Sequence, residues 1–562
     1  MRTRLLPILC VLALLLSACT VDGKPSAATA SVPVSGLTDE TAAPTAPPTE
    51  SAPDPSGSVT PGGWQVYTDP SAYRPAEGAL YTRPAGVDLR EFHPENANGR
   101  VYPYYTDTLY EDTGDGQSWA CGHHAGFVDE TGTIVTDGVY SSISILFDSL
   151  NEYDPYAEGP RLPLWRTGQL ESVTVVDEGE YTYPVGAIRY GVVAMDGSFS
   201  IPCEYVSIQP FSDRFLCNRS WDKPDFLIFD LSGNVLITSR ELYPDNCDWW
   251  HVSYAEGLYL LCSGLRDGTT EYRFVDESGT PVLGPYRFAN VFHGALAPVS
   301  LDGDRTGLID RTGSWVVEPT YSSISYAPDG CFLAEIDHGS DGAYGIYAVL
   351  DPEGREVFRT DGSSWINSVP CGYMLDRPEG EDDVFYDPSG QAIWTGADWT
   401  CVDEQTFYVK QNDGVLRIVN AATGAELQTE LLDYVEPGVA IRQGEMVRGY
   451  QGRNWDTGDF YFIPADLSGI REIEADPTFP LDFYESSSRL TDQVTGDAYY
   501  SIFNGHGFEL YSEDGDRLTT LQQSWATIYN GRIFEADDEL FCTYRSLDGE
   551  LLFRFPMYSG AD

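Results

Sequence analysis

Apolar residues along this chain occur in short runs that are separated by a recurring polar turn. A typical copy is Phe274–Gly279, with the sequence FVDESG, in which an aspartate follows the apolar run and a glycine ends the turn. Aspartate accepts hydrogen bonds from backbone N–H groups two residues further on, and glycine takes the left-handed conformation that a β-bulge needs. Each copy therefore predicts a hairpin that joins two antiparallel strands.

The turn glycine recurs over most of the chain at intervals of 34 to 46 residues, the spacing typical of propeller blades or stacked β-units. The turn glycines lie at Gly197, Gly233, Gly279, Gly313, Gly354, Gly390, Gly424, Gly469, Gly515 and Gly549. A tyrosine keeps the same phase, since Tyr140, Tyr205 and Tyr321 lie eight residues after the turn glycines Gly132, Gly197 and Gly313. Two landmarks in register indicate a structural repeat.

Short antiparallel units of this kind must close into a ring or stack on one another, because each unit alone leaves unpaired strand edges. The chain has about eleven units, more than the usual range of about four to eight blades in one propeller. We therefore predict an all-β repeat protein of propeller-like antiparallel units, arranged in one irregular ring with extra units or in two smaller rings. A superhelical β-solenoid-like stack is the alternative.

The clearest copies resemble those of WG-repeat proteins. The unit of that family has a glycine-aromatic strand, an Asp-x-x-Gly turn, an apolar strand that ends in Pro-x-Tyr, and one more strand. The best matches are 126–143, 191–208 and 307–324, and Gly345 begins a fourth. The tryptophan that names the family is replaced by Ala125, Tyr190, Thr306 and Tyr344, so these copies are divergent. The resemblance implies a binding or scaffolding role without a defined mechanism.

The resemblance to WG-repeat proteins covers part of the predicted body. Its clear copies lie within residues 120–420, and more divergent repeats fill 421–562. The whole β-repeat body is predicted to extend over residues 64–562.

Residues 1–18 are typical of a secretory signal peptide. Arg2 and Arg4 precede an apolar run from Leu5 to Leu16, which is the charged-then-apolar order of such signals and is too short to span a bilayer stably. The next residues complete the sequence LSAC at 16–19, which resembles the lipobox of bacterial lipoprotein precursors. An ordinary signal peptide with a chance cysteine is the alternative.

The lipobox resemblance implies that the thiol of Cys19 receives a diacylglyceryl group and that Cys19 becomes the mature N-terminus. Such an anchor would hold the protein at the cell membrane of a bacterium, facing outside the cytoplasm. Residues 19–63 continue as a stretch rich in Pro, Ala, Thr and Ser, which buries too little apolar surface to fold. We predict that this segment is a disordered tether.

Composition limits the partners of the body. The chain has 87 acidic and 33 basic side chains, for a formal net charge of −54, so its surface repels nucleic acid and anionic lipid. Such a surface attracts basic peptides or divalent cations, although solubility alone explains the same charge. Hydrophobic residues make up 42% of the chain, which excludes disorder over most of it.

Motifs of the commonest enzymes are absent from the sequence: it has no Gly-x-Ser-x-Gly elbow, His-Glu-x-x-His, Walker loop or dinucleotide fingerprint. Only residues 121–124 gather potential zinc ligands. A zinc site needs three or four ligands, and the further partners would have to come from distant units. Acidic loops such as 112–116 and 302–304 suit calcium, but none matches the twelve-residue calcium loop. We therefore assign no catalytic residue, metal ligand or cofactor, and a non-enzymatic role is favoured.

Tryptophans offer the most suggestive candidate contacts. Trp249 and Trp250 are adjacent, and exposed rings of this kind stack on sugars or form hot spots for protein binding. Other tryptophans in predicted loops or strand ends are Trp365, Trp394, Trp399, Trp455 and Trp525. We predict Trp249 and Trp250 as binding residues, with packing in a blade core as the alternative.

These features favour a membrane-anchored binding protein whose β-repeat surface recognises an extracellular protein, peptide or glycan. One alternative is an extracellular carbohydrate-active hydrolase or lyase on a propeller scaffold, with carboxylates contributed by several repeats. A second alternative is a structural spacer in the cell envelope, for which near-identical repeats are expected.

Overall fold

The computed structural model has two units, residues 1–54 and residues 55–562. It describes residues 80–556 except for 113–117, 148–160, 178–181, 244–246, 266–267, 328–329, 339–344, 361–364, 370–371, 377–382, 396–398, 404, 411–413, 443–444, 473–486, 504–506, 523–525 and 537–540. The predicted signal peptide, Cys19 and the predicted tether lie outside the described residues. Within the described part, no helix is both long and apolar enough to cross a membrane.

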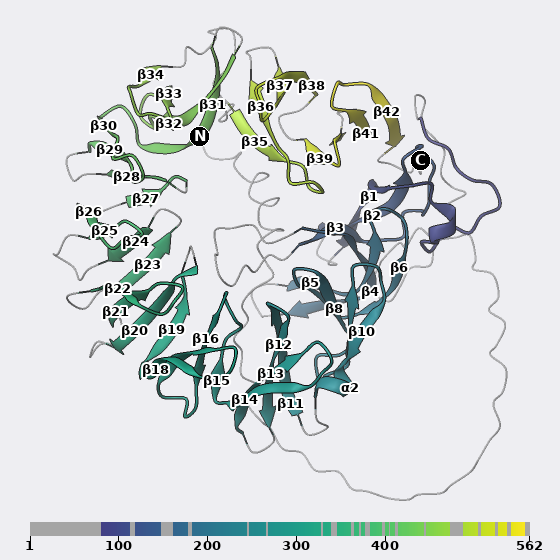
Figure 1. Cartoon of the computed structure of the whole chain (residues 1–562). Coiled ribbons are helices and arrows are strands. Elements are labelled where there is room, and N and C mark those ends of the chain that lie inside the picture. The colour runs from purple at the N-terminus through teal and green to yellow at the C-terminus, as the bar shows by residue number, and fades with distance from the viewer. Residues whose placement is uncertain are drawn as a thin grey trace, which may run out of the picture. The chain divides into compact units, whose positions relative to one another are not determined.

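Ten four-stranded antiparallel sheets, here blades 1 to 10, follow one another along the second unit (Figure 1). In every blade the strands pair in the order in which they occur in the chain. The described helices are short: η2 is Pro94–Asn96 and α2 is Ser239–Leu242. The predicted all-β fold class is therefore confirmed.

The strand bounds of blades 1 and 2 are β3 Ser142–Phe147, β4 Arg161–Asp177, β5 Thr182–Ala194, β6 Ser200–Tyr205, β7 Ser207–Pro210, β8 Arg214–Asn218, β9 Phe226–Asp230 and β10 Val235–Thr238. Those of blades 3 and 4 are β11 Cys247–Ala255, β12 Leu258–Leu265, β13 Thr270–Asp276, β14 Pro281–Tyr286, β15 Phe288–Ala289, β16 Leu296–Ser300, β17 Thr306–Asp310 and β18 Trp315–Tyr321. Blades 5 and 6 contain β19 Ser323–Tyr326, β20 Phe332–His338, β21 Gly345–Leu350, β22 Glu356–Arg359, β23 Trp365–Val369, β24 Gly372–Asp376, β25 Val384–Tyr386 and β26 Ala392–Thr395. Blades 7 and 8 contain β27 Trp399–Cys401, β28 Thr406–Lys410, β29 Leu416–Asn420, β30 Glu426–Thr429, β31 Tyr434–Arg442, β32 Glu445–Arg453, β33 Phe460–Pro464 and β34 Arg471–Glu472. Blades 9 and 10 contain β35 Ser487–Thr491, β36 Ala498–Phe503, β37 Phe508–Ser512, β38 Arg517–Leu521, β39 Thr527–Tyr529, β40 Arg532–Ala536, β41 Phe541–Ser546 and β42 Leu551–Pro556.

The predicted turn glycines join the third and fourth strands of each blade. Nine of the ten have φ between 70° and 92°, and Gly469 has a φ of 158°. In blade 4 the Asp310 Oδ1 atom accepts hydrogen bonds from the N–H groups of Thr312 at 2.8 Å and Ser314 at 3.0 Å. The N–H of Gly313 donates to the Asp310 carbonyl at 2.9 Å. The hairpin chemistry inferred from the sequence is therefore confirmed.

The tyrosine landmark has a structural explanation in strand pairing. Tyr205 pairs with Tyr190 and Tyr321 pairs with Thr306, so each tyrosine lies opposite the position where the WG repeat has its tryptophan. The glycine after that position lies against a bulge in the fourth strand, because the register shifts between Thr306 and Leu308. A Cβ atom on Gly307 would lie 2.4 Å from the carbonyl oxygen of Val317, so this position requires glycine.

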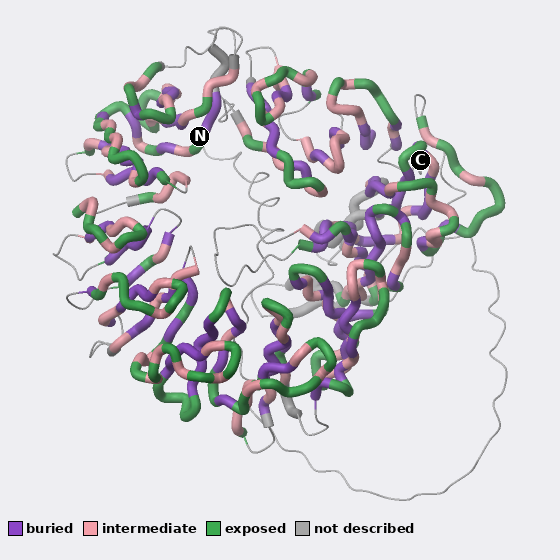
Figure 2. The backbone as a smooth tube through the Cα atoms, viewed as in Figure 1, coloured by how far each residue is buried: buried purple, intermediate pink, exposed green. Residues whose placement is uncertain are grey.

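Apolar side chains fill the space between neighbouring blades, and buried stretches occur in every blade (Figure 2). A further two-stranded sheet, β1 (Val101–Asp112) with β2 (Ser118–Asp129), completes the succession. Its residues share one core with blade 1 through Trp165 and another with blade 10 through Tyr544. The Tyr544 hydroxyl donates to the carbonyl of Pro103 at 2.6 Å.

The hairpin sheet therefore closes one ring of ten blades. Ten blades and one hairpin lie near the predicted number of units, and neither two smaller rings nor a solenoid-like stack is needed.

Candidate ligand-binding pocket

The two predicted binding tryptophans lie on β11 of blade 3. The ring of Trp250 stacks on Phe226 of blade 2 with a centroid distance of 4.8 Å and meets Tyr243 at 6.1 Å. Trp250 is thus half-buried against the core that joins these two blades. Trp249 pairs with Gly264, and its side chain lies outside the described residues. A binding role for Trp249 and Trp250 stays a prediction.

Metal and calcium sites stay unassigned. In the described part of the chain, no three or more His, Cys, Asp or Glu side chains gather in a way that could hold a metal ion. The side chains of residues 121–124 and the loop at 113–117 fall outside that part.

An open pocket of about 450 Å³ lies on blade 8. Its lining residues are Tyr434, Glu436, Gln451, Gly452, Arg453, Trp455 and Phe460. This volume falls within the range of small-molecule sites, about 300 to 1,000 Å³. Three aromatic rings and a few converging polar groups are also the usual composition of such sites.

Strand register brings the lining residues together. Tyr434 on β31 pairs with Arg453 on β32, and Arg453 pairs with Phe460 on β33. Glu436 pairs with Gln451, two residues further along the same two strands. Because alternate residues of a strand share one face of its sheet, these five side chains form two rows on one face of blade 8.

The carboxylate of Glu436 is held in place by two neighbours. The Tyr434 hydroxyl donates to Oε2 at 2.8 Å, and the side-chain amide of buried Gln451 donates to Oε1. Partial burial raises the pKa of Tyr434 to about 12, and the hydrogen bond and charge of Glu436 act in the same direction. Tyr434 therefore keeps its proton at neutral pH and remains a donor to this carboxylate.

Arg453 supplies the positive charge of the pocket. The central carbon of its guanidinium lies 4.6 Å from the centroid of the Trp455 ring and 5.2 Å from that of Phe460. Cations within about 6 Å of an aromatic face are attracted by the negative charge of its π system. One negative and one positive group therefore face the same pocket, and their formal charges cancel.

The loop that carries Trp455 is fixed by its own hydrogen bonds. The Asn454 side-chain oxygen accepts from the N–H groups of Asp456 and Thr457, each at 3.0 Å. The N–H of Trp455 donates to Asp433 at 2.9 Å, and Asp433 also forms an ion pair of 2.9 Å with Lys410 of blade 7. Trp455 is nonetheless 59% exposed, so its backbone is held in place while the residue is open to solvent.

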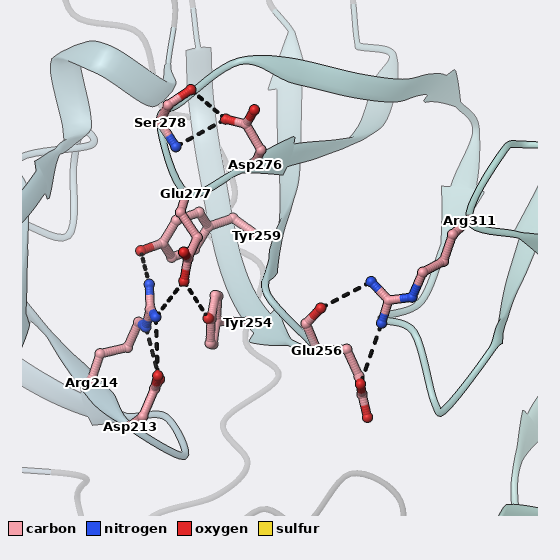
Figure 3. A network of polar contacts seen from close by, with 9 residues as sticks. All are labelled: Asp213, Arg214, Tyr254, Glu256, Tyr259, Asp276, Glu277, Ser278 and Arg311. Atoms are coloured by element: carbon pink, nitrogen blue, oxygen red, sulfur yellow. Dashed lines mark hydrogen bonds and ion pairs between the residues drawn. The ribbon is translucent and has the colours of Figure 1, made fainter.

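A second polar cluster joins blades 2 and 3 and surrounds the buried guanidinium of Arg214 (Figure 3). Arg214 forms ion pairs with Asp213 at 2.8 Å and with Glu277 at 2.6 Å, and it donates to the Tyr259 hydroxyl at 2.8 Å. Its guanidinium carbon lies 3.9 Å from the centroid of the Tyr254 ring. Burial alone would lower the pKa of Arg214, but these hydrogen bonds raise it, so the guanidinium stays charged.

The contact between blades 2 and 3 uses a position that recurs in the repeat. Glu277 follows the turn residue Asp276, whose carboxylate accepts from the N–H and hydroxyl of Ser278 (Figure 3). Arg311, which follows Asp310 in the next blade, reaches back to the Glu256 carbonyl at 2.9 Å and its carboxylate at 3.3 Å. The residue after the turn aspartate therefore fastens one blade to the preceding one, and we assign the Arg214 cluster a structural role.

We expect replacement of Glu277 by glutamine to change how stability depends on pH. Hydrogen bonds from Tyr254 and Arg214 hold the pKa of Glu277 below its ordinary value. Its contribution is therefore complete above the unfolded pKa of about 4.3 and is lost as the pH falls through the lower folded pKa. Urea midpoints measured at several pH values should show a modest wild-type advantage at neutral pH that shrinks in acid.

Glu130 gives a matched control for Glu277. It occupies the same position after Asp129 and is exposed like Glu277, but no arginine in the described part of the chain forms an ion pair with it. Glu130→Gln should leave the wild-type pH profile unchanged. An advantage of wild type over Glu277→Gln that stays constant down to pH 3 would contradict the ion-pair explanation.

Comparison with known proteins identifies one repeat of the chain. Residues 307–337 match the family described as WG containing repeat, and a search of curated proteins finds no match. Similar solved structures include the computationally designed Ika8 protein, at 12% identity and a TM-score of 0.24 over 62% of this chain and 95% of that one. BamB from Moraxella catarrhalis has 11% identity and a TM-score of 0.24 over 61% and 94%.

Kluyveromyces lactis Hsv2 has 8% identity and a TM-score of 0.24 over 47% of this chain and 95% of that one. TM-scores this low carry no argument about function. The family match at residues 307–337 shows that the chain contains a WG repeat, at the third of the copies identified in its sequence.

Proposed function

We propose that this protein is a membrane-anchored binding protein that works outside the cytoplasm and recognises a protein, peptide or glycan on its propeller. The observation that supports this proposal is the pocket of blade 8, in which an exposed tryptophan and a carboxylate held by hydrogen bonds line one cavity. Preorganised groups of this kind reduce the entropy that binding costs.

In this proposal, the membrane anchor of the protein is a lipid on Cys19. A diacylated cysteine holds a protein at a membrane because two acyl chains bury enough methylene groups for stable binding. The segment 19–63 would then act as a flexible spacer between the membrane and the propeller.

We expect Cys19→Ala to block normal maturation. The variant has no thiol to accept the diacylglyceryl group, so the precursor should remain uncut or be cut elsewhere, and the protein should leave the membrane fraction. Mass spectrometry of the N-terminal peptide measures this directly. A wild-type mature N-terminus that is an unmodified amine at a residue other than Cys19 would contradict the anchor.

Binding itself is tested with the chain that begins at Cys19, incubated with panels of glycans, peptides and secreted proteins. The proposal predicts that a ligand is retained reversibly, is recovered chemically unchanged and competes for the pocket of blade 8. Conversion of the ligand by the purified protein would favour the hydrolase or lyase alternative.

A further inference from the structure

We propose that the pocket of blade 8 binds a neutral saccharide, with a sugar ring against the ring of Trp455 and hydroxyl groups on Glu436 and Arg453. This inference rests on the proposed function, because it names the ligand class of the same site.

The charge of the pocket favours a neutral ligand. Glu436 and Arg453 carry opposite charges, while the whole chain has a formal net charge of −54. An anionic ligand would therefore approach a strongly repulsive surface without a net positive site to receive it.

The negative charge of the chain as a whole would attract a cationic ligand. In the pocket, however, the guanidinium of Arg453 already occupies the place beside the aromatic rings where a ligand cation would bind. The Arg453 guanidinium lies beside the rings of both Trp455 and Phe460. A ligand cation placed against the same faces would meet this fixed positive charge. The aromatic rings that line the pocket therefore suit an uncharged ligand better than a cationic one.

The polar groups of the pocket match hydroxyl groups, which both donate and accept hydrogen bonds. Each oxygen of the Glu436 carboxylate accepts one hydrogen bond from the protein and has lone-pair capacity for another donor. Guanidinium groups donate and never accept, so Arg453 offers the complementary partner. A polyhydroxylated ligand uses both kinds of group at once.

The ring of Trp455 provides an apolar platform for the ligand. Its backbone is fixed by Asp433 and its side chain is 59% exposed. The C–H groups on one face of a sugar ring carry partial positive charge and therefore pack well against the negative face of an aromatic ring.

The experiment uses the chain that begins at Cys19 and ligand-observed NMR with glucose, N-acetylglucosamine and their β-1,4-linked disaccharides as probes. Glucuronate and choline serve as the anionic and cationic comparisons. We expect saturation transfer to at least one neutral saccharide and no competition by glucuronate or choline. Trp455→Ala should weaken that binding at least about tenfold, and Glu436→Gln should weaken it as well.

Trp221 is the matched control, because it is 71% exposed and lies outside the pocket. Trp221→Ala should leave saccharide binding unchanged. The saccharide inference is overturned if no neutral saccharide binds, or if the Trp455→Ala variant binds the neutral saccharides as tightly as the wild type does. If a peptide or protein then bound in a Trp455-dependent manner, the proposed binding function would stand without the saccharide. The proposed function itself fails if no ligand of any class depends on Trp455 for binding.

Discussion

Replacing Gly307 by alanine is expected to lower the free energy of unfolding by about 3 kcal/mol, at the upper end of the usual cost of overpacking. The added Cβ would lie 2.4 Å from the carbonyl oxygen of Val317 and 2.8 Å from the nitrogen of Pro319. Both are backbone atoms, so the clash cannot be relieved by rotation of a side chain. The fourth strand of blade 4 must shift, and the core beside it must shift with it.

The measurement for Gly307→Ala is the urea midpoint of the full mature chain, followed by tryptophan fluorescence. Gly507→Ala is the matched control, because its Cβ would find its nearest neighbour, Cγ2 of Thr520, at 4.0 Å. This control should unfold at nearly the wild-type midpoint. Equal midpoints for the two variants would show that the bulge opposite Gly307 does not require glycine.

Arg214→Met is expected to destabilise the contact between blades 2 and 3 by about 2 kcal/mol. The substitution keeps much of the side-chain length but leaves the buried hydroxyl of Tyr259 without its donor, and it removes a cation from the ring of Tyr254. A buried polar group that loses its partner costs about 1 to 3 kcal/mol. The side chains of Asp213 and Glu277 are each 57% exposed. Water can therefore replace part of the hydrogen bonding that these carboxylates lose.

Arg355 provides the comparison for Arg214. It also forms ion pairs with two acidic side chains, Asp351 and Glu353, but its own side chain is 74% exposed. Exposed ion pairs contribute little to stability, so Arg355→Met should leave the urea midpoint unchanged. If Arg214→Met and Arg355→Met shifted the midpoint equally, burial would not be the reason for the importance of Arg214.

The repeat could be predicted from the sequence because its signals are local. An aspartate that accepts from the N–H groups two and four residues later, and a glycine with positive φ, fix a hairpin without help from distant residues. The closing unit could not be predicted in the same way. Its contacts join Tyr544 to Pro103, residues that are far apart in the chain and share no motif.

The pocket depends on strand register and on one loop, which explains why sequence reasoning chose other tryptophans. Tyr434, Arg453 and Phe460 meet because three strands pair in one register, and spacing along the chain carries little of that information. Adjacent residues of a strand face opposite sides of a sheet. Two neighbouring tryptophans therefore do not by themselves predict one contact surface, and Trp250 packs against Phe226.

Alternation within the pocket strands was a usable signal. The sequences Tyr-x-Glu at 434–436 and Gln-x-Arg-x-Trp at 451–455 place polar and aromatic residues at every second position. Alternate positions of a strand lie on one face of its sheet, so this spacing indicates that these polar and aromatic side chains share a face.

A crystal structure of the mature chain, grown with the tightest ligand from the binding panels, shows whether the pocket of blade 8 binds a ligand without turnover. We expect an intact ligand seated against the ring of Trp455 and hydrogen-bonded to Glu436. A ligand bound elsewhere with the blade 8 pocket unoccupied, or a cleaved ligand in the pocket, would overturn the proposed function of this pocket.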